Sequence, residues 1–326
     1  MKENYYITTE GVLARKENTV YFASKKTGKV PIPIQKVYAI YALAPLTLTS
    51  GVIHFLAQNN IPVFFFNYYG FYDATLYPRE PIQSGVSIVN QVKAYLDPSK
   101  RMHLAKMFIY GAARNMIRNM ERYKLEDHKS KINELISEIV RSSSITGLMN
   151  VEARIRQVYY NGLDQVLPEE FMIGKRTRRP PENKGNALIS FGNSLLYATT
   201  LAEIYHTSLN PTVSFLHEPS ERRFSLALDI SEVFKPLIVD RLVLYLVNKK
   251  IIQPEDFRKE FNGVLLKNKG RKKYVRAYHE RLRKKIKHRK LRRNVSYQHL
   301  IRLECYKIMK FILGVSESYE PFVIWW

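Results

Sequence analysis

The sequence is poor in the residues that build disulfides and cysteine metal centres, since it holds one cysteine, Cys305, in 326 residues. A single thiol excludes an internal disulfide and a zinc cluster of cysteines. The first residues, MKENYYITTEG, lack the apolar core of a signal peptide, and no uninterrupted apolar run is long enough to span a bilayer. We therefore expect a cytoplasmic protein without a membrane span.

Acidic residues are also scarce relative to basic ones. The chain has 29 Asp and Glu against 52 Lys and Arg, which gives a formal net charge of +23. Such an excess repels itself unless a polyanion or solvent screens it. Nucleic acid is the polyanion that this charge favours, and an anionic membrane surface is the alternative. Hydrophobic residues make up 45% of the chain, which excludes a disordered protein.

The residue pattern changes once along the chain. Residues 1–80 are rich in β-branched and aromatic residues between turn signals, with one short helix expected at TSGVIHFLAQNN. From Val86 onward apolar residues recur with helical spacing, and Asp97 before Pro98 is a typical start of a long helix. We predict an α+β fold with a small N-terminal β-rich domain (1–80), a linker (81–90) and a larger all-α domain (91–326).

Further helices are predicted from the same spacing. They cover Lys131–Ile139, Asn150–Asn161, Asn186–Tyr205, Leu226–Val247, Tyr274–Arg293 and Tyr297–Leu313.

Glu152 lies at a position where a charge is unexpected. It falls on the apolar stripe that Leu148, Ile155 and Tyr159 form on a predicted helix, whereas Arg154 and Arg156 are expected to point elsewhere. A carboxylate is rarely buried unless it is paired or bound to a metal. Glu152 is therefore either paired with an arginine of another helix or part of a metal site.

The segment FLHEPSERRFSLALDISEVFKP places two more carboxylates in an apolar helix. Asp229 and Glu232 are three residues apart, so both lie on one side of the helix and repel each other unless a cation is near. Pro236 cannot donate to the carbonyl of Glu232, so we expect the helix to bend or open there. With His217, these carboxylates form a candidate Mg²⁺ or Mn²⁺ site, although a lone histidine is commonly a satisfied surface or core residue.

Basic residues concentrate near the C-terminus. Residues 258–293 contain seventeen Lys and Arg but two acids, with Tyr274, Tyr278 and His279 interleaved. A shorter basic loop, GKRTRRPPENKG, precedes residue 186. These runs either form a solvated charged face or contact a nucleic-acid backbone. The predicted DNA contacts are Arg176, Arg178, Arg179, Arg222, Arg223, Lys235, Arg271, Lys272, Lys273, Arg283, Lys284 and Lys285.

The order of these motifs resembles a known family. LMNVEARIRQVYY, then RTRRPPENKGNALISFGNSLLY, then FLHEPSERRFSLALDISEVFKPLIVDRLV are similar to motifs of the universal CRISPR-associated adaptation integrase, the first-numbered protein common to CRISPR systems. The N-terminal EGVLARKENTVYF and IPVFFFNYYGFYDATLYP also resemble that family. The resemblance extends over nearly the whole chain.

The resemblance implies a function and a set of site residues. Members of that family form homodimers, assemble with a small second universal CRISPR-associated protein, and insert captured DNA fragments into a CRISPR array. The implied ligands of Mg²⁺ or Mn²⁺ are Glu152, His217 and Glu232, with Asp229 as a supporting acid and Lys235 as a DNA contact. The implied activity is that of a metal-dependent DNA endonuclease and integrase, and the implied substrates are double-stranded and branched DNA. A 3′-hydroxyl of DNA would attack the phosphodiester in integration, and water would attack it in nicking.

Three questions remain open at the level of the sequence. The protein could instead be a stand-alone nuclease for branched DNA. It could also be a basic DNA-binding scaffold whose acids are structural ion pairs, with partners such as Arg154 or Arg222. The aromatic C-terminal segment ESYEPFVIWW either docks onto a partner or packs back onto the helical domain.

Overall fold

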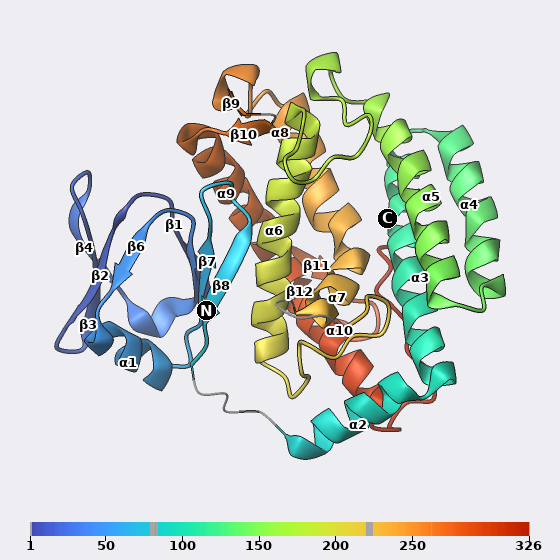
Figure 1. Cartoon of the computed structure of the whole chain (residues 1–326), viewed down its shortest axis with the longest axis horizontal. Coiled ribbons are helices and arrows are strands. Elements are labelled where there is room, and N and C mark those ends of the chain that lie inside the picture. The colour runs from blue at the N-terminus through green and yellow to red at the C-terminus, as the bar shows by residue number, and fades with distance from the viewer. Residues whose placement is uncertain (1, 79–81, 83, 220–223, 262, 326) are drawn as a thin grey trace. The chain divides into compact units, whose positions relative to one another are not determined.

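The chain forms two compact units in a computed structural model, one of residues 1–81 and one of residues 82–326 (Figure 1). The structure describes residues 2–78, 82, 84–219, 224–261 and 263–325. The described residues give the predicted α+β fold, with a β-rich N-terminal unit and a mostly helical C-terminal unit. Among them, no helix is both long and apolar enough to cross a membrane.

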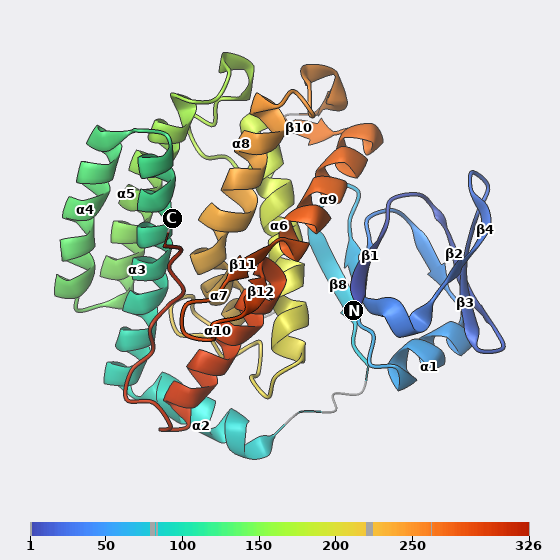
Figure 2. The same cartoon turned by 180° about the vertical axis from the view of Figure 1, so that it is seen from behind.

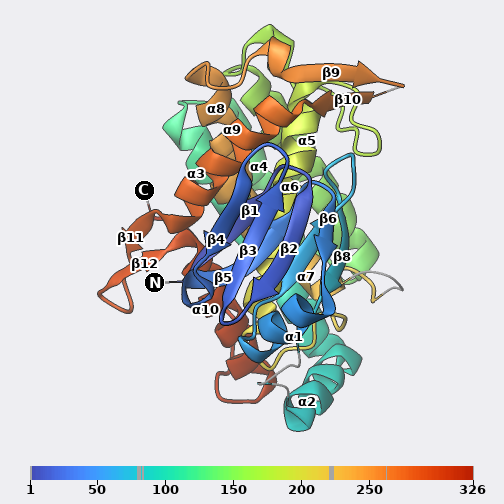
Figure 3. The same cartoon turned by 90° about the vertical axis from the view of Figure 1, so that its left-hand side faces the viewer.

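The described strands of the N-terminal unit pair into two sheets, in the orders β4-β3-β2-β6 and β1-β5-β7-β8 (Figure 3). Strands β1 and β7 run parallel to β5, and β6 runs parallel to β2, while the other pairs are antiparallel. The elements are β1 Glu3–Ile7, β2 Gly11–Lys16, β3 Thr19–Ser24, β4 Gly28–Ile32, β5 Val37–Ala42, β6 Leu46–Leu48, α1 Ser50–Gln58, β7 Val63–Phe66 and β8 Tyr72–Leu76.

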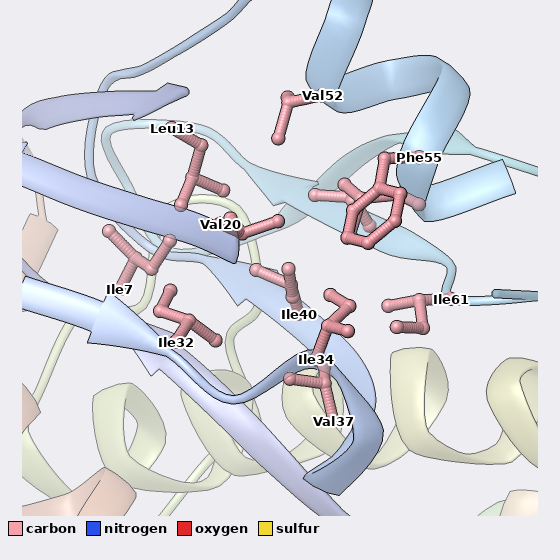
Figure 4. Close-up of a cluster of buried hydrophobic side chains, with 12 residues drawn as sticks. Ile7, Leu13, Val20, Ile32, Ile34, Val37, Ile40, Val52, Phe55 and Ile61 are labelled. Atoms are coloured by element: carbon pink, nitrogen blue, oxygen red, sulfur yellow. The ribbon is translucent and has the colours of Figure 1, made fainter. Parts of the chain in front are cut away.

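The core of this unit is aliphatic. Alternate strand residues such as Leu13, Val20 and Ile40 point inward and meet Val52 and Phe55 of α1 (Figure 4). Helix α1 begins where the side chain of Thr49 accepts a hydrogen bond from the Val52 N–H. The predicted short helix is therefore confirmed, and it contributes an apolar face to this core.

The C-terminal unit is built from helices α2–α10 and two hairpins (Figures 1 and 2). The helices are α2 Gly85–Leu96, α3 Pro98–Arg122, α4 Glu126–Arg141, α5 Ile145–Asp164, α6 Lys184–Tyr205, α7 Ser225–Lys235, α8 Arg241–Asn248, α9 Asn268–Arg283 and α10 Tyr297–Ile312. The hairpins are β9 Phe257–Glu260 with β10 Gly263–Leu266, and β11 Lys285–Lys287 with β12 Asn294–Ser296. Short 3₁₀ turns lie at Glu169–Phe171 and Pro254–Asp256 of this unit, and another lies at Ile34–Lys36 of the N-terminal unit.

Two predicted boundaries of the helical unit differ from the structure. Helix α2 begins at Gly85, so residues 85–90, which were expected to belong to the linker, are helical. The helix predicted to reach Arg293 ends at Arg283 and is followed by β11 and β12. Ile286 of β11 is buried opposite Val295 of β12, and this cross-strand pair overrides the helical spacing of Leu282 and Ile286.

The predicted opening of the helix near Glu232 is confirmed. Helix α7 ends at Lys235, and residues Pro236–Asp240 form a π-helix that leads into α8. Because Pro236 has no N–H, the regular α-helical hydrogen bond to Glu232 cannot form. Side chains from other helices satisfy the carbonyls of this segment: Asn119 Nδ2 donates to Pro236 O over 2.9 Å, and Arg281 Nε donates to Leu237 O over 3.1 Å.

The aromatic C-terminal segment packs back onto the helical unit. Phe322 stacks on Phe234 of α7, with the ring centroids 6.0 Å apart. Asn115 of α3 donates to Phe322 O and accepts from Ile324 N, both over 2.9 Å. Asn115 Nδ2 also donates to Val233 O over 2.9 Å, so the tail and α7 share one anchor.

A buried charge cluster as the candidate active site

Two carboxylates from different helices meet at one arginine. Glu152 on α5 pairs with Arg156 one turn further along the same helix, and the guanidinium of Arg156 also pairs with Glu232 on α7. Helix α3 packs against both α5 and α7 and holds them together. The expectation that Arg156 points away from the stripe of Glu152 is therefore wrong, because residues four apart lie on one helical face.

Glu232 is held by cations on both of its oxygens. Its side chain is 5% exposed, and Lys235 Nζ lies 2.5 Å from Oε1 while Arg156 engages Oε2. Lys235 is itself 15% exposed at the end of α7. Two carboxylates and two cations thus form a nearly balanced cluster in the interior of the helical unit.

His217 and Asp229 form the second part of the site. Asp229 is fully buried, and its carboxylate accepts backbone N–H groups of Phe215, Leu216 and His217 over 2.7, 3.0 and 3.0 Å. Asp229 Oδ1 also lies 2.8 Å from His217 Nδ1. An acceptor of three N–H groups is an ionised carboxylate, so Nδ1 carries the proton and Nε2 is left as the basic nitrogen. Asp229 therefore orients the imidazole and fixes the loop that carries it.

Electrostatics connect His217 to the carboxylates. Burial by itself would raise the pKa of Glu152, but the charge and hydrogen bond of Arg156, with smaller effects of Lys235 and His217, hold that pKa below its usual value. Burial and repulsion from Arg156 lower the pKa of Lys235 well below its usual value. The structure thus joins Glu152, Glu232 and Lys235 to one network of ion pairs and pairs His217 with Asp229, and His217 acts on Glu152 electrostatically.

The donor types suit a hard divalent ion, but a guanidinium stands between them. Two carboxylates and an imidazole backed by a carboxylate are ligands for Mg²⁺ or Mn²⁺. Within the described part of the chain, no three His, Cys, Asp or Glu side chains lie close enough together to hold an ion. Arg156 lies between Glu152 and Glu232 and pairs with both. The types of these side chains therefore suit such an ion, while in this structure Arg156 is the cation that the two carboxylates hold.

Apart from Lys235, which pairs with Glu232, the predicted DNA contacts fall into three groups. Arg178, Arg179, Lys272, Arg283, Lys284 and Lys285 are exposed. Other basic side chains are engaged within the fold: Arg176 donates to Asn186 and Ser190 over 2.9 Å each, Arg271 donates to Leu266 O over 3.2 Å, and Lys273 pairs with Asp256 over 2.5 Å. Arg222 and Arg223 lie outside the described residues.

Sequence reasoning missed two charged residues of the site. The role of Arg156 could have been predicted from the sequence, because it follows Glu152 by four residues and so lies on the same face of the helix, where the two side chains can form an ion pair. Asp240, at the end of the π-helix, is 1% exposed and reads in the sequence as an ordinary polar position. The cations that act on it electrostatically, such as Arg156 and Arg176, come from other elements, so no local pattern could have found it.

Comparisons with known proteins agree on one family. The family model described as CRISPR associated protein Cas1 matches residues 5–280. The CRISPR-associated endonuclease Cas1 of Methanothermobacter thermautotrophicus is 52% identical over 325 residues, which cover 100% of this chain and 96% of that protein. A solved structure of a CAS1 protein from Thermotoga maritima is 36% identical with a TM-score of 0.89, covering 98% of this chain and 100% of that one.

More distant solved structures share the fold. A casposase bound to an integration product has a TM-score of 0.86 at 22% identity, covering 98% of this chain and 92% of that one. A chain of a Cas6-RT-Cas1–Cas2 complex has a TM-score of 0.86 at 19% identity, covering 100% of this chain and 36% of that one.

Proposed function

The chain belongs to the Cas1 family of CRISPR-associated proteins, and we propose that it is a Mg²⁺- or Mn²⁺-dependent DNA endonuclease and integrase that inserts DNA fragments into a CRISPR array. The observation that carries the proposal is the convergence of Glu152 and Glu232, from separate helices, on one buried cationic group. A relative that is 52% identical is named an endonuclease, which supports the same activity.

Glu152, His217 and Glu232 would hold the divalent ion. When bound, the ion would polarise a phosphodiester oxygen and offset the charge that develops during attack. Asp229 keeps the proton of His217 on Nδ1 and so directs the basic Nε2 outward as a ligand. The three N–H groups that Asp229 accepts make that orientation rigid before DNA arrives.

Basic side chains would position the DNA. Lys235 lies beside Glu232 and can contact a phosphate at the reacting bond. The exposed cations Arg178, Arg179, Lys272, Lys284 and Lys285 would bind backbone phosphates further away, which sets register without reading sequence. In integration a 3′-hydroxyl attacks the phosphorus and the 3′-oxygen of the cut strand leaves, while in nicking water takes the role of the nucleophile.

The proposed assembly follows the family. The N-terminal unit would form the homodimer contact, and the dimer would bind the small second universal CRISPR-associated protein together with double-stranded or branched DNA. Solved chains that share this fold come from a casposase bound to an integration product and from a Cas6-RT-Cas1–Cas2 complex, which supports this choice of partners.

A second candidate function is favoured by one observation. Arg156 pairs with both carboxylates, as expected if Glu152 and Glu232 were structural ion pairs of a non-catalytic DNA-binding scaffold. That alternative predicts that chelators change no activity. The two candidates therefore differ in their response to metal.

The deciding experiment is a strand-transfer assay with metal titrated, in the presence and absence of the companion protein. We expect Glu152→Ala and His217→Ala to abolish strand transfer and nicking but to leave DNA binding largely intact. Glu138→Ala is the matched control, because Glu138 is a more exposed carboxylate that pairs with Arg154 on the surface. Full strand transfer by Glu152→Ala, or by the wild type in excess EDTA, would reject the proposal in favour of the scaffold.

A further inference from the structure

Two buried asparagines of α3 hold the backbone where α7 ends and the π-helix Pro236–Asp240 begins. Nδ2 of Asn115 donates to Val233 O over 2.9 Å, and Nδ2 of Asn119 donates to Pro236 O over 2.9 Å. A π-helix departs from regular α-helical hydrogen bonding, and Pro236 has no N–H to contribute. A neighbouring helix therefore supplies hydrogen bonds that fix this segment.

The amide of Asn119 connects four elements of the helical unit. Its Nδ2 also donates to the hydroxyl of Tyr159 on α5 over 2.7 Å, and its Oδ1 accepts from Nε of Arg241 on α8 over 2.6 Å. A guanidinium only donates and a carbonyl only accepts, so these partners allow one orientation of the amide. Asn119 is fully buried, and a shift of its side chain towards one partner would cost a bond to another.

Asn115 repeats this arrangement one turn earlier on the same face of α3. It is also fully buried, and its Nδ2 donates to Phe322 O of the C-terminal segment as well as to Val233 O. Its Oδ1 accepts from Ile324 N over 2.9 Å. Here too the partners allow one orientation of the amide, since carbonyls only accept and an N–H only donates.

The two carbonyls that these asparagines hold flank the end of α7, which carries residues of the candidate site. Glu232 directly precedes Val233, and Lys235 directly precedes Pro236. Fixing the carbonyls of Val233 and Pro236 therefore fixes the backbone from which the side chains of Glu232 and Lys235 project.

Asn119 also reaches the helix that carries the other carboxylate. Tyr159 follows Glu152 by seven residues, close to two helical turns, so both side chains lie on one face of α5. One nitrogen atom of Asn119 thus donates to α5 and to the segment that follows Glu232. This single amide links the two elements whose carboxylates meet at the candidate site.

Packing alone does not require amides at these positions. A buried polar group costs free energy unless it is hydrogen-bonded, whereas an apolar side chain of similar size needs no partner. Hydrogen bonds restrict both distance and angle, while apolar contacts are not directional. Fully bonded amides therefore define the spacing of α5 and α7 more narrowly than apolar residues would, as a reacting site demands.

We propose that Asn119 is a positioning residue for strand transfer, and that Asn115 supports it. The two amides set the separation and rotation of Glu152 and Glu232 by holding the end of α7 to α3 and, through Tyr159, to α5. The inference rests on the proposed function, because it requires Glu152 and Glu232 to take part in strand transfer. It holds whichever cation the two carboxylates bind during the reaction.

The test is a strand-transfer assay with the full chain, the companion protein and Mn²⁺, in which the rate is measured against DNA concentration. We expect Asn119→Ser to lower the rate at saturating DNA by roughly 10- to 100-fold, because a displacement of about 1 Å can cost that much. Asn115→Ser should lower the same rate. The DNA concentration that gives half the maximal rate should not change, since both asparagines are buried away from DNA.

Asn186→Ser is the matched control. Asn186 is also fully buried in this unit, and its Nδ2 also donates to two oxygens, Ile173 O over 2.8 Å and Lys175 O over 3.0 Å. These bonds hold the loop before α6 instead of α7. Thermal melting followed by circular dichroism should show a similar loss of stability in Asn186→Ser and Asn119→Ser, but Asn186→Ser should keep the maximal rate.

Several results would overturn the inference. They are an unchanged maximal rate in Asn119→Ser, an equal fall in Asn186→Ser, or a change confined to the DNA concentration at half the maximal rate. All rates are measured below the melting transition of the least stable variant, and Asn119→Asp replaces Asn119→Ser if the latter does not fold. A crystal structure of the Asn119 variant in which Glu232 and Lys235 keep their wild-type positions would also reject it.

Failure of the proposed function gives a different pattern. If the wild type performs no strand transfer, or if Glu232→Gln transfers strands as fast as the wild type, then the site itself is wrong and the inference falls with it. If Glu232→Gln loses strand transfer and Asn119→Ser does not, then only the positioning role of Asn119 is wrong.

Discussion

Removing the charge of Asp240 should change how the stability of the protein depends on pH. Burial raises the pKa of Asp240 from 3.8 to about 6 in the folded protein, even though Arg156, Tyr159 and Lys235 act in the opposite direction. The folded state therefore binds a proton more tightly than the unfolded state does. Between these two pKa values, the free energy of unfolding of the wild type should fall as pH rises.

The magnitude follows from the size of that shift. A difference of about 2 pKa units corresponds to about 3 kcal/mol, because each unit is worth about 1.4 kcal/mol. The destabilisation is absent below pH about 4, grows through pH 4–6 and is complete above pH about 6. Asp240→Asn is neutral at every pH, so relative to the wild type it should gain up to about 3 kcal/mol between pH 4 and 7.

Urea unfolding in EDTA measures this effect, with the helical signal followed by circular dichroism at pH 4, 5, 6 and 7. The matched control is Asp127→Asn, an exposed aspartate in the first turn of α4 of the same unit. A difference between Asp240→Asn and the wild type that stays constant over this range would refute the reasoning. So would a variant that becomes relatively less stable as pH rises.

Two further predictions concern the tail and the basic surface. Phe322→Ala removes the stack on Phe234 and should lower the free energy of unfolding by about 3–5 kcal/mol. Because the tail and Val233 share Asn115, strand transfer should fall as well, and exposed Val315→Ala, which should change neither, is the control. Replacing Lys272, Lys284 and Lys285 with glutamine should flatten the slope of log affinity against log salt by about 2–3 in DNA-binding titrations. An unchanged slope would show that these cations do not contact phosphates.

Arg156 links the two carboxylates of the candidate site. Its ion pairs with Glu152 and Glu232 join α5 to α7 and balance the charge of both carboxylates. Removing one partner of a buried pair is strongly destabilising, so Glu152→Gln is a better probe of metal binding than a truncation.

Local chemistry in the sequence determined much of the helical framework. Asp97 before Pro98 predicts the start of α3, and Asp97 Oδ1 accepts from Ser99 N over 2.9 Å, as a cap should. Pro236 predicts the opening of the helix after Glu232, because the missing N–H is a property of the residue itself. The spacing of apolar residues and the cap at Asp97 also distinguish the helical unit from the β-rich N-terminal unit.

Only the tertiary structure decided which charges meet. Arg156 faces Glu232 and Asp240 lies in the same interior because α3 fixes how α5 and α7 are rotated against each other, and a single helix carries no such information. Packing also overrode the local sequence pattern at β11: the spacing of apolar residues predicts a helix there, but Ile286 pairs with Val295 in a hairpin. The same holds for Lys273, which the sequence offers as a DNA contact and the fold ties to Asp256. The sequence determined the residue types of the site, and long-range packing decided their partners.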